Sequence, residues 1–563
     1  MLNLHARLPA GIAGDWNAPD VRGEGFATSA AWFGANERPL AGWWTAPERP
    51  SRNGVVIAPP LGYEYWSSHR SLRTLAESLG RAGWHALRFD WDGTGDSAGE
   101  ACDAHRLAAW RASLAHAVTA MRNAGVDRIA LLGVRFGATL ALTDAAALGV
   151  DDVIACAPLA TGTRWLRELR MLGIADPRNP GTVMYSGLVV DAGTAAGLAG
   201  IDLARTAPPR VARTLLVTYP GPADAGLAQS LRADGRTVEV HPCEAMRSML
   251  DVPAGEDRVP DHWIEPILTW LGPPQANNSG ANPPARPATD ITWQGGKVRE
   301  SFTTIEHLVA VCSVPLDRDP DAVVVFLNSG ADPHVGPGRA WVDYSRALAR
   351  RGYACVRLDF TAFGESPDGG HPPGRPYDPH CLDDTVRTVA ALRHRYRHVV
   401  LAGLCVGAWI AMRAAQVTRV DGVFALNPLL WWKPGLPIIM RVPDIVAWRA
   451  PMRRRQHRLA RLGVWSLLDA VGIRSRASCW LIALRRRHIP VVLSYAEGDD
   501  GLAYLRDRCS RRLASELCSG WLTLEEVPGI DHPMFRMWRR PAIVEQLTRM
   551  LAALPHPAAK AER

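Results

Sequence analysis

The chain lacks the cysteine spacings that mark metal sites and disulfide frameworks. Its ten cysteines are scattered over 563 residues, and no two of them form a C-x-x-C pair. Structural zinc sites and small disulfide-bonded domains both depend on closely spaced cysteines. The distribution therefore favours a reducing compartment and excludes a disulfide-stabilised secreted module. We expect no metal and no other cofactor.

Long apolar runs are also missing. No stretch reaches 18 consecutive apolar residues, so no membrane-spanning helix is expected. Residues 1–20 lack a basic segment followed by an apolar one, which a secretory signal would require. The content of 47% hydrophobic and 21% charged residues is that of an ordinary globular protein. These observations predict a cytoplasmic location.

The length of the chain requires more than one hydrophobic core. Residues 272–290 are rich in Pro, Gly, Asn and Ala and show no apolar periodicity, so they are interpreted as a linker. This interpretation divides the chain into domains at 1–271 and 291–563.

The two domains repeat each other. Each contains a short apolar strand, an amphipathic helix, a glycine stop, a second strand and a turn. The matching segments are 54–99 and 322–369. Asp90 and Asp359 are 269 residues apart, and Arg135 and Cys405 are 270 residues apart. A constant offset at two distant landmarks predicts a tandem duplication.

Strands and helices alternate along each half, which predicts the fold class. Alternation of this kind gives a mostly parallel sheet covered by helices on both faces. Residues 127–133 and 398–403 are continuous apolar runs, as buried parallel strands require. We therefore expect an α/β protein with two tandem domains. Each is a mostly parallel sheet flanked by helices and carrying a cap insertion.

One apolar strand of the second half leads into a tight glycine frame, in which Gly403 and Gly407 surround Cys405. A strand, a G-x-nucleophile-x-G turn and a helix form a nucleophile elbow. The turn strains the central backbone and exposes its side chain, while the glycines let strand and helix pass closely. The N-terminus of the following helix favours a thiolate. Cys405 is the predicted nucleophile.

Such elbows are followed in sequence by an acid and then by a histidine. Asp499 and Asp500 end a later strand, and His532 precedes the last helix, so the order is correct. Asp499 is the preferred acid, with Asp500 as the alternative. The histidine would accept the thiol proton while the carboxylate orients its ring.

The predicted oxyanion hole uses two backbone N–H groups, those of Val406 and of Ala331 in the loop after the first strand. His334 lies in the same loop. It either serves as a second functional histidine or shapes the loop.

The first half repeats the glycine frame but places Arg135 at its centre, and a guanidinium is not a nucleophile. The segment 243–253, which corresponds to the histidine loop, contains no histidine, and His262 lies further on. We expect this half to be catalytically silent. Arg135 then either binds an anion or fills an inactive pocket.

The two halves resemble the α/β-hydrolase superfamily, in the branch of serine aminopeptidase-like and exosortase-system-associated hydrolases. The resemblance covers nearly the whole chain and is carried in the second half by 328–339, 351–366, 403–408 and 529–535. Relatives often read G-L-C-S-G-A, and Val406 replaces that serine. Similar cysteine elbows occur in dienelactone hydrolases and polyhydroxyalkanoate synthases. The resemblance implies acyl transfer through a thioester.

The expected cap of the second half, 431–488, is strongly basic. It holds 13 Lys and Arg against two Asp, interleaved with tryptophan and isoleucine. Three alternatives remain open: a solvated face, a docking surface for a phosphate or another polyanion, and contact with an anionic membrane surface. No nucleic-acid-binding motif is present, so nucleic acid is disfavoured.

The sequence thus predicts a hydrolase or acyltransferase that acts on a small-molecule or carrier-bound ester or thioester. The alternative is a non-catalytic binding or scaffold protein built from two degenerate domains. Reactivity of Cys405 toward an alkylating reagent distinguishes the two, because a buried structural thiol is inert.

Overall fold

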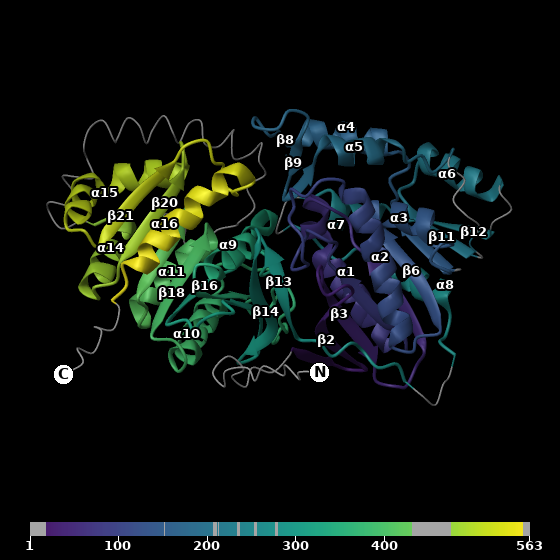
Figure 1. Cartoon of the computed structure of the whole chain (residues 1–563), viewed down its shortest axis with the longest axis horizontal. Helices are drawn as coiled ribbons and strands as arrows, with labels where there is room; N and C mark the ends of the chain where they lie inside the picture. Colours follow the sequence, from purple (N-terminus) through teal and green to yellow (C-terminus); the bar gives the residue numbers. More distant parts are fainter. Residues whose placement is uncertain are drawn as a thin grey trace, which may run out of the picture.

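The computed structural model describes residues 19–555, apart from 151, 206–210, 212, 234–236, 253–255, 276–279 and 431–473. Two nine-stranded sheets organise these residues, one in each half (Figure 1). The strands of the first sheet are β1 (Asp20–Gly23), β2 (Phe26–Phe33), β3 (Leu40–Pro47), β4 (Asn53–Ala58), β5 (His85–Phe89), β6 (Arg128–Val134), β7 (Asp152–Cys156), β11 (Arg213–Thr218) and β12 (Thr237–Pro242). Those of the second are β13 (Ala288–Trp293), β14 (Gly296–Ile305), β15 (Leu308–Val314), β16 (Ala322–Phe326), β17 (Ala354–Leu358), β18 (His398–Leu404), β19 (Gly422–Leu426), β20 (Val491–Ala496) and β21 (Leu522–Val527).

Both sheets have the same topology. Their spatial orders are β1-β2-β3-β5-β4-β6-β7-β11-β12 and β13-β14-β15-β17-β16-β18-β19-β20-β21. The first three strands of each half are antiparallel and the other six are parallel, because helical crossovers connect the latter. The predicted mostly parallel sheets are confirmed.

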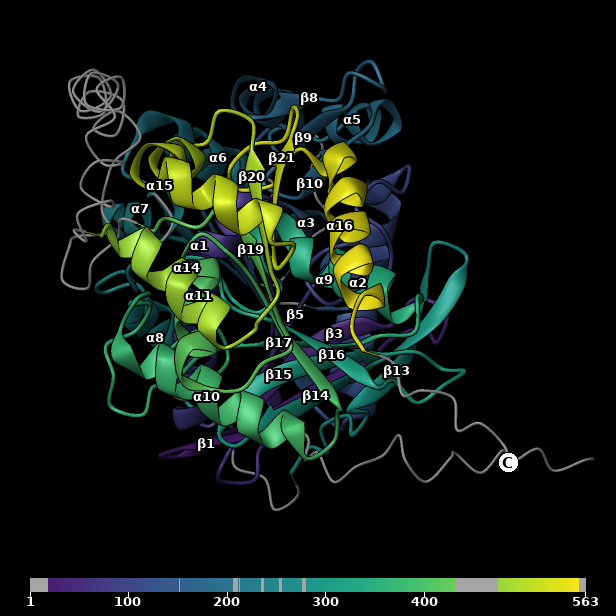
Figure 2. The same cartoon turned by 90° about the vertical axis from the view of Figure 1, so that its left-hand side faces the viewer.

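Helices cover both faces of each sheet, so the central strands are fully buried. In the first half one face packs α2 (Arg106–Asn123), α3 (Phe136–Asp144) and α6 (Pro222–Ala233), and the other packs α1 (Tyr63–Arg81), α7 (Arg247–Leu250) and α8 (Ile264–Leu271). In the second half one face packs α10 (Pro379–Arg393), α11 (Val406–Val417), α14 (Arg476–Arg486) and α15 (Asp500–Cys518), and the other packs α9 (Ala340–Ala349) and α16 (Arg540–Ala552) (Figure 2). Short 3-10 turns are η1 (Glu244–Met246), η2 (Pro337–Arg339) and η3 (Met537–Arg539). No helix among the described residues combines the length and the apolar character that crossing a bilayer requires.

Both halves carry an insertion at the same place in the sheet order. In the first half it lies between β7 and β11 and contains α4 (Gly162–Leu172), α5 (Ala192–Ala199) and a small sheet of β8 (Ile174–Ala175), β9 (Val183–Tyr185) and β10 (Leu188–Val190). In the second half it lies between β19 and β20. Of the predicted basic cap, 431–473 lies outside the described residues, and 474–488 includes α14.

The segment interpreted as a linker lies against the first half. Ala281 N–H donates to Ser51 O (3.2 Å), and Asn282 N–H donates to Ala124 O (2.8 Å). Strand β13 already begins at Ala288, so the last three residues expected as linker belong to the second sheet. These backbone contacts fix part of the connection to the domain that precedes it.

The two halves meet through their antiparallel strands (Figure 1). One apolar cluster joins side chains of β2 and β3 with those of β13, β14 and β15. Within it Trp32 stacks on Phe302 with ring centroids 5.0 Å apart, and Trp43 meets the same ring edge-on at 5.5 Å. The domains therefore share a buried hydrophobic contact in addition to the connecting chain.

Candidate active site

Cys405 occupies a strained turn between β18 and α11. Its backbone has φ 54° and ψ −106°, a region that non-glycine residues rarely adopt. Its N–H donates to Leu426 O of the neighbouring strand (2.9 Å). A Cβ on Gly403 would lie 2.2 Å from the carbonyl carbon of Gly407, and one on Gly407 would lie 2.7 Å from Asn328 O. Both elbow positions therefore require glycine.

His532 and Asp499 are brought together at the ends of neighbouring strands. Asp499 Oδ2 lies 2.6 Å from His532 Nδ1, and the carboxylate is buried while the imidazole is 38% exposed. The second carboxylate oxygen of Asp499 accepts the N–H of Gly501 (2.7 Å) and caps α15. Asp500 is the first residue of that helix, so the structure places Asp499 beside the histidine.

The sulfur of Cys405 completes this chain of contacts. It hydrogen-bonds with His532, whose other ring nitrogen is engaged by Asp499. Burial disfavours a charged ring, but the hydrogen bonds with Asp499 and Cys405 outweigh it and raise the pKa of His532 to about 10. The carboxylate and the sulfur on either side of the imidazole therefore both favour its protonated form.

Tyr377 is a site residue that the sequence analysis did not identify. Its hydroxyl hydrogen-bonds with the Cys405 sulfur, and its ring packs edge-on against Trp409. Burial and the neighbouring sulfur raise the pKa of Tyr377 well above its usual range, so the phenol stays a donor. Its backbone has φ 70°. Strained residues gather at functional sites, but no local pattern in the sequence marks this one.

Asn427 is a second residue near the site that the sequence analysis did not identify. Its side-chain amide donates to His532 O (2.9 Å), and its carbonyl accepts the N–H of Ala496 (2.7 Å). The residue joins the end of β19 to the loop that carries the histidine. It holds His532 in place without contacting the sulfur in any interaction that the structure records.

The loop expected to complete the oxyanion hole is fixed by buried polar contacts. Asn328 donates to Asp332 O (3.0 Å) and to Asp359 Oδ1 (3.1 Å), and accepts the N–H of Phe360 (2.9 Å). Ala331 lies in the turn that the Asp332 N–H closes onto Ser329 O. Val406 directly follows Cys405 as the first residue of α11.

His334, considered above as a second functional histidine, is buried in the contact between the halves. Its Nδ1 lies 2.7 Å from Asp359 Oδ2, and its Nε2 lies 2.7 Å from Asp96 Oδ2 of the first half. Burial favours the neutral ring, but the two carboxylates raise the pKa of His334 well above its usual range. This histidine bridges the domains and shapes the loop, the second of the two alternatives.

The elbow of the first half has the same backbone and different chemistry. Arg135 has φ 53° and ψ −113°, and its Nε donates to Glu64 Oε1 at 2.6 Å. Glu168 lies 3.6 Å from the same guanidinium. His262 is exposed at the start of the closing helix. Arg135 is thus neutralised by carboxylates of its own domain, which argues against the anion-binding alternative.

A cavity of about 270 Å³ opens between the halves beside the loop that contains Ala331. Its lining includes Trp66 and Arg73 of α1 and Ala331, Asp332 and Gly374 of the second half. Neither Cys405 nor His532 lines it.

Comparisons with known proteins agree with this architecture. Residues 324–558 match the model of the alpha/beta hydrolase family. A search of curated proteins gives no match. The sheet order and the elbow identify each half as an α/β-hydrolase-like domain.

Several solved structures are similar to one half of the chain. TT1662 from Thermus thermophilus is 18% identical with a TM-score of 0.31, over 46% of this chain and 99% of that chain. A dienelactone hydrolase from Anabaena variabilis is 13% identical with a TM-score of 0.32, over 46% and 99%. Est1E from Butyrivibrio proteoclasticus, with bound ferulic acid, is 18% identical with a TM-score of 0.33, over 43% and 96%.

Proposed function

We propose that the second α/β-hydrolase-like domain is a thiol-dependent hydrolase or acyltransferase, which forms an acyl-enzyme on Cys405. One observation carries the proposal. The thiol sits on a strained elbow, within hydrogen-bonding reach of an imidazole that is 2.6 Å from a buried carboxylate. Nucleophile, base and orienting acid in this relation are the requirement of covalent acyl transfer.

In the first step His532 takes the Cys405 proton and the sulfur attacks the acyl carbonyl carbon. The proton is held on the ring nitrogen that faces the sulfur, while Asp499 stabilises the imidazolium through the other nitrogen. The new C–S bond converts the carbonyl oxygen to an oxyanion. The N–H groups of Val406 and Ala331 are the proposed donors to it.

In the next step of the catalytic cycle the tetrahedral intermediate collapses. The bond to the leaving alcohol or thiol breaks, His532 returns its proton to that group, and an acyl thioester remains on Cys405. Water, an alcohol or an amine then attacks this thioester with His532 as the base. Water as acceptor makes the protein a hydrolase, and the others make it an acyltransferase.

Two features extend the proposal to substrate and partner. A thiolate attacks thioesters and activated esters well, so the proposed substrate is a small-molecule or carrier-bound acyl group. The basic residues of 431–488 are proposed to contact a phosphate or an anionic surface on that carrier. Within the described part of this segment, Arg485 pairs with Glu516 at 2.9 Å.

The first half is proposed to act as a silent partner that holds the oxyanion loop. Asp96 reaches His334 in this loop. The guanidinium of Arg339, at the end of the loop, donates to the carbonyls of Gly93, Gly95, Ser97 and Gly99. The first half thus fixes the second domain's loop while its own elbow carries Arg135.

The test is turnover of a panel of acyl thioesters and aryl esters by the full chain. Cys405→Ala should abolish turnover, while Cys102→Ala, which removes an exposed cysteine of the first half, should leave it unchanged. Equal activity of the Cys405→Ala chain and the unmodified chain would contradict the proposal. Failure of the whole panel, together with no alkylation of Cys405 by iodoacetamide at neutral pH, would favour the scaffold alternative.

A further inference from the structure

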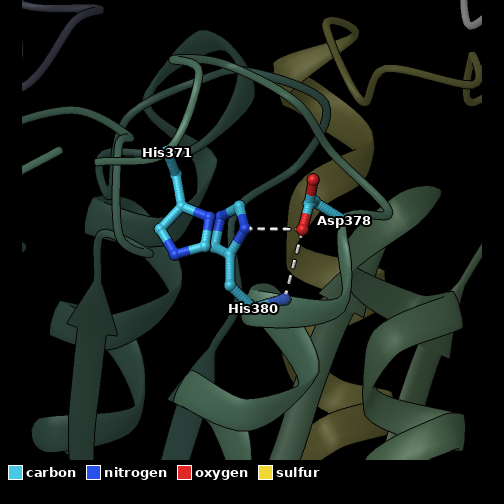
Figure 3. Close-up of side chains that lie close together, drawn as sticks. All are labelled: His371, Asp378 and His380. Carbon is cyan, nitrogen blue, oxygen red and sulfur yellow. Dashed lines mark hydrogen bonds and ion pairs between the residues drawn. The ribbon is translucent and has the colours of Figure 1, made fainter. Parts of the chain in front are cut away.

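Three potential metal ligands meet where the loop after β17 enters α10. They are His371, Asp378 and His380, and their ligand atoms all lie within 4.8 Å of one another (Figure 3). The imidazoles of His371 and His380 lie with ring centroids 4.4 Å apart. His380 is buried, Asp378 is half-buried and His371 is exposed. The cluster is separate from the Cys405, His532 and Asp499 contacts.

The hydrogen bonds of His380 show which of its nitrogens is available. Its Nε2 lies 3.1 Å from Thr361 O, and a carbonyl only accepts, so this nitrogen carries a hydrogen. The other nitrogen, Nδ1, lies 2.8 Å from Asp378 Oδ1 (Figure 3). Nδ1 is therefore the nitrogen of His380 that is available as a metal ligand, and a carboxylate oxygen of Asp378 lies beside it.

The second imidazole provides a third potential ligand. A protein metal site needs a third ligand in addition to His380 and Asp378. His371 supplies it, since its ring nitrogens make no hydrogen bond to any described residue and its exposed side chain is free to adjust. The arrangement of His380, with its remote N–H on a backbone carbonyl, is the usual outer support of a metal-bound histidine.

We propose that His371, Asp378 and His380 bind a zinc ion. Two imidazoles and one carboxylate are a ligand set that zinc accepts, with a fourth position open to water. Calcium and magnesium prefer oxygen ligands and do not fit it. The loop is already constrained for this purpose, because Asp378 also caps α10 through the N–H of His380 and Pro379 follows it.

Because of the position of this loop, a bound zinc ion would also affect the surroundings of the Cys405 thiol. Tyr377, which hydrogen-bonds with Cys405, is the residue directly before Asp378. A zinc ion that fixes Asp378 against two histidines therefore also fixes Tyr377 against the sulfur. This second step rests on the proposed function of Cys405, whereas zinc binding itself does not.

Zinc binding is tested by titrating the EDTA-treated full chain with zinc chloride and by measuring bound zinc after gel filtration. We expect one zinc per chain, and binding at least about tenfold weaker in His371→Ala and Asp378→Asn. Asparagine keeps the helix cap, so the second variant separates ligand loss from misfolding. His262→Ala, an exposed histidine of the first half, is the matched control. Equal binding by His371→Ala and the unmodified chain, or no zinc on the unmodified chain, would overturn the site.

The Cys405→Ala chain tests whether the thiol holds the zinc instead. This variant should still bind one zinc per chain, and loss of zinc from it would overturn the assignment. The link to Tyr377 has its own readout. Zinc should change the rate at which iodoacetamide alkylates Cys405 in the unmodified chain and leave it unchanged in His371→Ala. An unreactive thiol in a chain that still binds one zinc would count against the proposed function and not against the metal site.

Discussion

The same strained turn occurs twice in this chain with opposite chemistry. Arg135 and Cys405 share φ values of 53° and 54° and ψ values of −113° and −106°, and each N–H donates at 2.9 Å to the carbonyl that ends the neighbouring strand. Around Cys405 the structure gathers His532, Asp499 and Asn427. Around Arg135 it gathers Glu64 and Glu168. The strand–helix packing and the glycines set the turn, and the central residue decides only what it does.

The contact between the halves is also built from equivalent residues of the two domains. Arg88 forms two 2.7 Å bonds with Glu365 of the other half, and Arg357 pairs with Asp96. Arg357 and Glu365 are each 269 residues after Arg88 and Asp96, so the two pairs are exchanged reciprocally. Two equivalent surfaces meet in this way in a twofold dimer. Here one continuous chain carries both.

The two halves differ at one position next to the site. In the first half Tyr65 donates its hydroxyl to Asp90 at 2.7 Å, and in the second His334 takes the corresponding bond with Asp359. Histidine has two polar ring atoms, whereas tyrosine has a single hydroxyl. The second ring nitrogen of His334, Nε2, contacts Asp96 of the first half. The loop of the second half is therefore tied to the first half by a bond that has no reciprocal partner among the described contacts.

The largest expected effect separates the two histidines that precede the closing helices. His532→Ala should lower acyl-enzyme formation at least about 10³-fold, because the base and the imidazolium are lost together. His262→Ala should leave the rate within a factor of two. Rapid-quench mass spectrometry measures both rates, and equal losses would mean that His532 has no special role.

A smaller effect is expected from breaking the exchanged ion pairs. Arg357→Ala should lower the free energy of unfolding by about 3–5 kcal/mol, because it leaves Asp96 and Glu300 buried without this partner. Arg88→Ala should cost less, since Arg88 pairs with one buried carboxylate, that of Glu365, whereas Arg357 pairs with two. Urea unfolding measures both, with the exposed Arg318→Ala as a control that should change little. The opposite order would contradict the larger role that the structure gives to Arg357.

Much of this comparison could be predicted from the sequence and part of it could not. Strands that alternate with helices predict the mostly parallel sheets, the repeated glycine frame predicts the two elbows, and chain order singles out Asp499 and His532. The contacts of Asp96 with His334 join residues 238 positions apart, which no local pattern records. Tyr377 lies in a loop without periodicity. The cysteine spacing, on which the expectation of no metal rested, carries no information about His371 and His380.

Asn427→Ala converts one position of the second half to its counterpart, since Ala157 has the same left-handed backbone with φ 46° against 44°. The variant should fold, but it removes two hydrogen bonds that hold the His532 loop. A loss of about 1–3 kcal/mol in stability and roughly tenfold in acylation rate is expected. Unfolding curves and the acylation rate check it, and Ala157→Asn should leave the rate unchanged.

The smallest expected effect is a pH dependence of stability. The pKa of His532 is raised to about 10, so its contribution is complete below about pH 6.5 and is lost as the pH rises through 10. Because the ring is 38% exposed, screening reduces this contribution to about 1 kcal/mol. The stability difference between the unmodified chain and His532→Gln should be largest at pH 6 and vanish near pH 11. A difference that grows with pH would contradict the assigned sign.

The central claim is that one elbow is chemically active and the other is not. Its most direct test is peptide mapping by mass spectrometry after brief exposure of the full chain to an acyl thioester and an acid quench. The account predicts one acyl group, on the peptide that contains Cys405, and none there in His532→Ala. An unmodified Cys405 in a chain that turns over the thioester would contradict it.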